Sequence, residues 1–107
     1  MRTKTLWIKE EHLRQILDGR KTVEVRVGYS NIRRLRPGDR LLLNNQHLYD
    51  IVRTTCYDSF ASLVAGEDPA TIAPDLTADE LLSSLRAIYL PAKEALGVYA
   101  LEIKSVQ

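Results

Sequence analysis

The stretch Gly-Arg-Lys-Thr-Val-Glu-Val-Arg, which begins at Gly19, constrains the fold of this chain more than any other feature. It follows a short run over 10–18 in which Leu13, Ile16 and Leu17 are spaced three and four residues apart. This spacing predicts an amphipathic helix with one buried side. Gly19 comes directly after the run and is suited to the left-handed conformation that ends a helix.

The residues after this glycine alternate as they do in a strand. Val23, Val25 and Val27 occupy every second position, which predicts that all three point to the same buried face. The opposite face then carries Thr22, Glu24 and Arg26, with successive side chains about 6 to 7 Å apart. The pattern therefore predicts an acid and a base side by side on a strand whose other face is core.

The rest of the chain mixes strands and helices without an internal repeat, which indicates an α+β fold. Asn44 and Asn45 tolerate positive φ and predict a hairpin turn. Thr77 and Glu80 have the spacing of a capping box, and Pro91 prevents the helix that they begin from continuing. The expected elements are strand 4–9, helix 10–18, strand 21–27, a basic connection 28–37, strands 39–44 and 47–57, helices 58–65 and 77–89, and strand 97–104.

The late helix 77–89 and the segment before it carry further expectations. Leu81, Leu82, Leu85 and Ile88 form the expected buried stripe of the helix. Residues 65–75 are rich in acids and helix breakers and predict a surface connection. A connection of this kind is either a simple link or a lid over a cleft.

A chain of 107 residues, with 45% hydrophobic and 27% charged residues, has the size and composition of a single globular domain spanning 1–107. No apolar run reaches the ~20 residues of a membrane span. The first residues lead into a strand pattern without the features of a signal peptide, so we expect a cytoplasmic protein with no membrane partner. The sequence indicates no oligomeric state.

Metal and thiol chemistry has little support in the sequence. Cys56 is the only cysteine, and together with His12 and His47 it gives no paired ligand spacing. We therefore expect no metal site and no cofactor. Because no His or Asn partner is identifiable, Cys56 is expected to be a buried thiol rather than a nucleophile.

The net charge of +1 hides an uneven distribution. Residues 1–54 contain twelve of the fifteen Lys and Arg residues but only six of the fourteen Asp and Glu residues. If the two halves of the chain occupy different parts of the domain, a positive patch lies beside the polar strand and attracts phosphate. If the halves interleave, the asymmetry averages away.

The motif resembles the signature of a known family. Gly19, Lys21, Glu24 and Arg26 match the pattern Gly-x-Lys-x-x-Glu-x-Arg that follows a helix in ASCH domains, and Pro-Gly-Asp at 37–39 matches a turn before a hydrophobic strand. The resemblance also includes the opening strand 6–9, the helix end 87–89 and the closing strand 98–103. ASCH domains are related to the PUA RNA-binding fold. The resemblance therefore implies a small PUA-like open β-barrel of about five to six strands with flanking helices.

This resemblance implies binding of RNA, a nucleotide or a modified nucleoside in a polar cleft around the motif. The expected ligand-binding residues are Lys21, Glu24, Arg26, Tyr29, Ser30, Asn31, Arg33 and Arg34. In such a cleft a carboxylate accepts from the amino groups of a base, a guanidinium donates to phosphate or carbonyl oxygens, and a tyrosine supplies a stacking face.

Each of these residues also has a plainer interpretation. Glu24 and Arg26 are equally suited to a simple surface salt bridge, Lys21 and the arginines to a solvated surface, and Tyr29 to a half-buried rim. Trp7 and Tyr57 are expected in the core or at the rim rather than as stacking platforms. Tyr89 and Lys93 follow the late helix, and the fold decides whether they reach the cleft.

A hydrolase is the alternative function, because some ASCH proteins are 4-acetylcytidine amidohydrolases and others have been described as ribonucleases. In the amidohydrolases a threonine lies three positions after the motif lysine and a glutamate precedes the late helix. Here Glu24 and Pro74 occupy these positions, and Thr22 or Asp75 would have to substitute, so we expect acetylcytidine hydrolysis to be absent or very slow. For a ribonuclease, Lys21 and Glu24 are the candidate catalytic acid–base pair.

Overall fold

The structure is a computed structural model and describes residues 1–106, which form five strands and six helices. Their bounds are β1 Thr3–Leu6, α1 Glu10–Leu17, β2 Val23–Val27, α2 Ser30–Arg33, β3 Arg40–Leu43, β4 His47–Tyr57, α3 Phe60–Gly66, α4 Pro69–Ile72, α5 Ala78–Ile88, α6 Pro91–Glu94 and β5 Val98–Ser105. Within residues 1–106, no helix is both long and apolar enough to cross a membrane.

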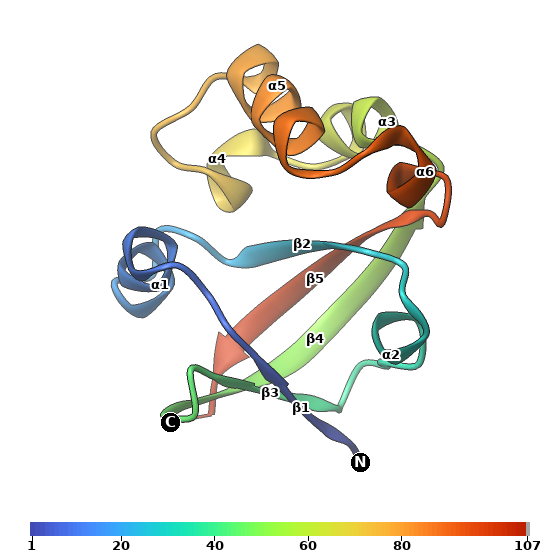
Figure 1. The fold of residues 1–107 in the computed structure, drawn as a ribbon. Coiled ribbons are helices and arrows are strands. Elements are labelled where there is room, and N and C mark those ends of the chain that lie inside the picture. The colour runs from blue at the N-terminus through green and yellow to red at the C-terminus, as the bar shows by residue number, and fades with distance from the viewer. Residues whose placement is uncertain (107) are drawn as a thin grey trace.

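All five strands belong to one sheet with the order β1-β3-β4-β5-β2. β1 runs parallel to β3, and every other neighbouring pair is antiparallel. The sheet curls into a half-barrel whose edge strands, β1 and β2, are not paired with each other (Figure 1). We call this unpaired junction the seam. The predicted α+β, PUA-like fold is confirmed, with five strands.

Two apolar cores lie on the two faces of this sheet. The inner core fills the half-barrel between the sheet and helices α1 and α2, and includes Leu6, Ile16 and Leu43. The outer core lies between β2, β5 and helices α3 to α5, and includes all three valines of β2, as their alternation predicted. Helices α3 to α6 lie together on one side of β2 (Figure 1). The acidic half of the chain is therefore gathered largely on one side, although its strand β5 lies within the sheet.

The local signals for turns and caps are confirmed. Gly19 has φ 84° directly after the end of α1. Asn44 and Asn45 have φ values of 52° and 58° and connect β3 to β4 in an antiparallel hairpin. The capping box of α5 is complete, because Thr77 accepts from the Glu80 backbone N–H and the Glu80 carboxylate accepts from the Thr77 backbone N–H.

Asn44 also extends the pairing of β1 beyond its last strand residue. Its backbone N–H donates to the Leu6 carbonyl at 2.9 Å. Its side-chain Nδ2 donates to the Ile8 carbonyl at 2.9 Å, and its Oδ1 accepts from the Ile8 N–H at 2.7 Å. The side-chain amide thus takes the place of a strand neighbour for Ile8.

Several predicted boundaries were wrong. β1 ends at Leu6 rather than residue 9, because the main chain of Ile8 pairs with a side chain rather than with a strand. The expected basic connection contains α2. The expected surface connection 65–75 contains α4, where the Asp68 carboxylate caps the helix by accepting from the Ala70 N–H and Ile72 is buried in the outer core. Pro91 begins a new helix, α6, after α5 has ended at Ile88.

Three burial predictions were also wrong. Leu17 is 47% exposed because it lies on the flank of the last turn of α1, and Ile88 is 64% exposed at the end of α5. Cys56 is exposed rather than buried. Gly97 lies beside its sulfur and has no side chain to cover it.

Candidate functional site

Lys21 is buried where the chain leaves Gly19 and enters β2, with 5% of its surface exposed. Its ammonium donates to the Val23 carbonyl at 2.7 Å and to the Ile72 carbonyl at 2.9 Å, and lies 3.2 Å from Glu24 Oε1. An ammonium has three N–H donors, so all of them have an acceptor in this arrangement. Lys21 therefore connects β2 to the end of α4.

Glu24 lies beside this ammonium and is 8% exposed. Its Oε2 accepts from Arg26 Nε at 2.8 Å, while its Oε1 faces Lys21. Burial raises the pKa of Glu24, but the charges of Lys21 and Arg26 and their hydrogen bonds outweigh burial and hold the net pKa below its ordinary value. The carboxylate is therefore ionised at neutral pH, between two fixed cations.

Arg26 connects the two edges of the sheet across the seam. Its Nε donates to Glu24 on its own strand, and its Nη2 donates to the Trp7 carbonyl at 3.1 Å, just beyond the end of β1. Its Nη1 has no partner in the part of the chain that the structure describes. The guanidinium is held in place by two bonds and keeps an N–H group for a ligand.

A cavity of about 290 Å³ lies over these three side chains, and we call it the first cavity. Besides the three motif residues, its polar lining includes Lys9, His12 and Ser84, and Trp7, 68% exposed, stands at its rim. Its apolar walls come from α4, α5 and the segment between them: Ile72, Leu76, Leu81, Leu85 and Ile88. An apolar cavity with a few converging polar groups is typical of a small-molecule site, and this volume is at the low end of the usual range of ~300–1,000 Å³.

A second cavity of about 290 Å³ lies further along the seam. It shares Trp7, Arg26 and Tyr89 with the first cavity, and adds Lys4 from β1 with Tyr29 and Asn31 from around α2. The seam therefore carries two adjacent hollows with common residues between them.

The predicted site residues divide into three groups. Lys21, Glu24 and Arg26 meet in the first cavity, and Tyr29 and Asn31 meet Arg26 in the second. The remaining three line neither cavity and are exposed: Ser30, Arg33 and Arg34. The part of all eight residues in ligand binding stays a prediction.

The fold also shows where the residues lie whose position relative to the cleft the sequence left undecided. Tyr89 lines both cavities, and the Lys93 ammonium lies 5.2 Å from the centre of the Tyr29 ring. Tyr57 lines neither cavity. Asp75, one of the two substitutes for a hydrolase residue, instead accepts from Gln15 and lies near Arg20 on the surface.

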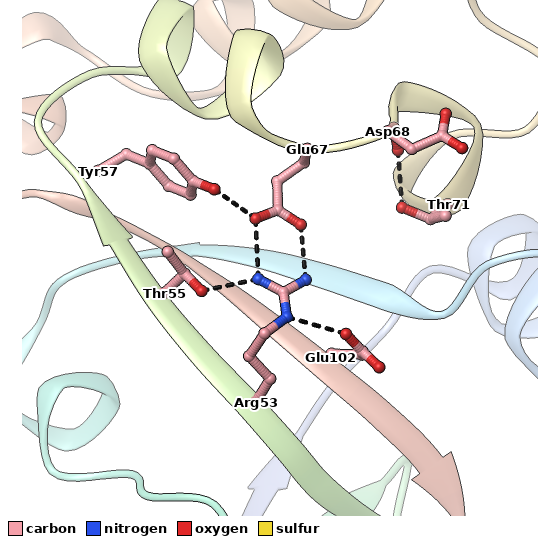
Figure 2. A network of polar contacts seen from close by, with 7 residues as sticks. All are labelled: Arg53, Thr55, Tyr57, Glu67, Asp68, Thr71 and Glu102. Atoms are coloured by element: carbon pink, nitrogen blue, oxygen red, sulfur yellow. Dashed lines mark hydrogen bonds and ion pairs between the residues drawn. The ribbon is translucent and has the colours of Figure 1, made fainter.

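Tyr57 belongs to a separate polar network centred on Arg53, shown in Figure 2. The Arg53 guanidinium donates to both oxygens of Glu67 at 2.7 and 2.9 Å, and also to Thr55 and Glu102. Hydrogen bonds from Arg53, against the opposing effect of burial, lower the pKa of Glu67 below its ordinary value. Glu67 directly precedes the N-cap of α4, whose other end is held by Lys21. This network therefore fixes the start of the helix that walls the first cavity.

Trp7 and Tyr89 are the main cavity residues to which the sequence analysis gave little weight. Trp7 lies between the buried Leu6 and Ile8, so its outward direction could have been found from alternation alone. Tyr89 packs on Phe60 with ring centres 5.7 Å apart, a contact between distant parts of the chain that carries no local signal. No cluster of three or more metal-ligating side chains occurs among residues 1–106.

Comparisons with known proteins place this geometry in a family. The crystal structure of hypothetical protein PH0355 has a TM-score of 0.91 at 24% identity, covering 99% of this chain and 100% of that chain. The solution NMR structure of protein PF0455 from Pyrococcus furiosus has a TM-score of 0.81 at 24% identity, covering 98% of each chain. These likenesses show the fold alone, and no curated protein matches the chain. The model of the ASCH domain, a family generally taken to be RNA-binding, matches residues 6–107, and the chain therefore belongs to the ASCH domain family.

Proposed function

We propose that this domain binds single-stranded RNA at the seam, with an unpaired base in the first cavity and Arg26 on the adjoining phosphate. The observation that carries the proposal is the guanidinium of Arg26, which is held by Glu24 and Trp7 and keeps Nη1 without a partner among residues 1–106, beside an apolar cavity. A guanidinium fixed in this way loses little conformational entropy when it contacts a phosphate.

The chemistry of the cavity suits the edge and the faces of a base. Glu24 is a buried carboxylate with further lone pairs, so it accepts from the N–H groups of a base edge and repels phosphate. The leucine and isoleucine walls suit the apolar faces of the ring, and Trp7 offers an exposed aromatic surface at the rim. Stacking of this kind requires an unpaired base, which favours single strands over duplexes.

The lysine of the motif supports binding more than catalysis. Lys21 directs its three N–H groups to fixed acceptors, and an ammonium in that arrangement is suited to holding Glu24 and α4 in position. Contrary to the alternation, Thr22 does not share a cavity with Glu24 and Arg26: it lines a separate hollow with Arg53 and Glu67 and is absent from the first cavity. The arrangement of the motif residues therefore favours recognition over RNA cleavage.

The test is fluorescence anisotropy with a labelled single-stranded RNA, the same RNA as a duplex, and a single-stranded DNA of the same sequence, at low and moderate salt. We expect salt-sensitive binding that is strongest for single-stranded RNA. Arg26→Gln should weaken it about tenfold or more, since a hydrogen bond to a charged group contributes about 1.5–3 kcal/mol. Arg14→Gln, which removes the same charge from an exposed position on α1, is the matched control.

Two further measurements keep this test decisive. Trp7→Ala changes a side chain that is 68% exposed, so the fold should tolerate it while RNA affinity falls. Gel analysis of the RNA after incubation detects cleavage, and cleaved RNA would indicate that the domain is a ribonuclease. Absence of RNA binding by the wild-type domain at low salt, or unchanged affinity in both Arg26→Gln and Trp7→Ala, would overturn the proposal.

A further inference from the structure

We propose that the second cavity holds the neighbouring nucleotide of the same strand, so that the domain recognises a dinucleotide unit with Arg26 on the phosphate between the two bases. This inference rests on the proposed function of the first cavity. It adds a second subsite and assigns Lys4, Tyr29 and Asn31 to it.

The arrangement of the two cavities matches two linked ligands. Each has a volume of about 290 Å³, and both are lined by Trp7, Arg26 and Tyr89. Arg26 lies on the boundary, where its bond to the Trp7 carbonyl holds the guanidinium in the seam. A single cation between two similar hollows is suited to the one phosphodiester that joins two successive nucleosides.

The two cavities differ in whether a carboxylate lines them, and this suits them to different parts of the ligand. The first contains the carboxylate of Glu24, which suits the N–H groups of a base edge, together with the cations Lys9, Lys21 and Arg26. The second is lined by the cations Lys4 and Arg26 and by no acidic residue among those described. The second cavity therefore has no carboxylate to repel a phosphate, and Asn31 is a neutral donor and acceptor for ribose or base.

Tyr29 gives the second cavity its stacking surface. Its side chain is 43% exposed, and the Lys93 ammonium lies 5.2 Å from the centre of the ring. The cation covers part of the ring and adds positive charge beside the cavity, while the remaining ring surface is free to take a base. Trp7 and Tyr29 thus supply one aromatic side chain for each of the two nucleotides.

The experiment compares a nucleoside 5′-monophosphate with its 5′-phosphorylated dinucleotide by calorimetry, in parallel series for adenine, cytosine, guanine and uracil. We expect the dinucleotide to bind wild-type protein about tenfold or more tightly. Lys4→Gln and Tyr29→Leu should reduce dinucleotide affinity by a larger factor than mononucleotide affinity, so that the ratio of the two affinities falls toward one. Lys104→Gln, an exposed lysine on β5, should change neither.

The outcomes separate this inference from the proposed function. Equal affinity of wild-type protein for mononucleotide and dinucleotide would overturn the second subsite and leave RNA binding in place. A parallel loss of mononucleotide affinity in Lys4→Gln and Tyr29→Leu would show that the two cavities are not distinct subsites, and would also overturn it. If neither ligand binds and RNA is not bound either, the proposed function itself fails.

Discussion

Replacing Lys21 by methionine tests whether the motif lysine acts as a structural support. Methionine keeps an unbranched apolar side chain but removes the three donors. The carbonyls of Val23 and Ile72 then lose their side-chain donor, and Glu24 keeps only Arg26 as a charged partner. Lys21 and Glu24 are only 5% and 8% exposed, so water can hardly replace the hydrogen bonds and the charge that the substitution removes.

The expected cost follows from that burial. Removing one partner of a buried ion pair typically destabilises a protein by about 3–5 kcal/mol. The total stability of a domain is about 5–15 kcal/mol, so this loss is a large part of it. For a domain of this size, a loss of about 3 kcal/mol corresponds to a fall in Tm of roughly 12 °C or more.

The assay is urea unfolding followed by far-ultraviolet circular dichroism, for wild type, Lys21→Met, Glu24→Gln and the double variant. Because both single changes act on one pair, their costs should not add, and the double variant should be more stable than the sum by about 0.5–3 kcal/mol. Lys104→Met places the same substitution at an exposed lysine and should leave the unfolding midpoint near that of wild type. An unfolding midpoint in Lys21→Met equal to that of wild type, or strictly additive losses of unfolding free energy, would refute the structural role. Lys21 would then again be a candidate catalytic residue.

Two further predictions concern the polar network centred on Arg53 and the close backbone contact at Gly28. Glu67 has a lowered pKa in the folded state, chiefly through Arg53, so its stabilising contribution is present above its unfolded pKa of about 4.3 and is lost as the pH falls through the folded pKa. Glu67→Gln should therefore lose less unfolding free energy than wild type between about pH 5 and about pH 3. Glu11→Gln, at an exposed position, is the control and should follow wild type. Parallel plots of unfolding free energy against pH for Glu67→Gln and wild type would contradict the prediction. Gly28→Ala should destabilise the domain by about 1–3 kcal/mol, because its Cβ would lie 2.6 Å from the Leu96 carbonyl oxygen. An unchanged denaturation midpoint would show that this approach of the two segments is not required.

The sequence predicted the features that depend on near neighbours. Alternation placed Val23, Val25 and Val27 on the core face, and residue chemistry located the turn at Asn44 and the cap at Thr77. Each of these follows from backbone preference or period within a few residues, so no knowledge of distant segments was needed.

The rest depended on contacts between distant segments. The acceptor that explains the burial of Lys21, the Ile72 carbonyl, lies 51 residues away in a helix that was predicted to be a loop. Arg26 reaches the Trp7 carbonyl across 19 residues, and that contact exists only because the sheet leaves β1 and β2 unpaired. The motif could therefore be recognised as a polar cluster, while the fold was required to show that Lys21 and Glu24 are buried and that Arg26 keeps an N–H group without a partner among residues 1–106.

The turn residue Asn44 also helps to position the proposed RNA-binding surface. Its side-chain amide holds both main-chain groups of Ile8, 36 residues earlier, and Trp7 is therefore fixed between a strand residue and this asparagine. Glycine suits a tight hairpin as well as asparagine does, so a design that considered the turn alone would accept Asn44→Gly. That exchange would leave the hairpin intact and release the tryptophan beside both cavities. Position 44 therefore supports the proposed recognition surface even though it lines neither cavity.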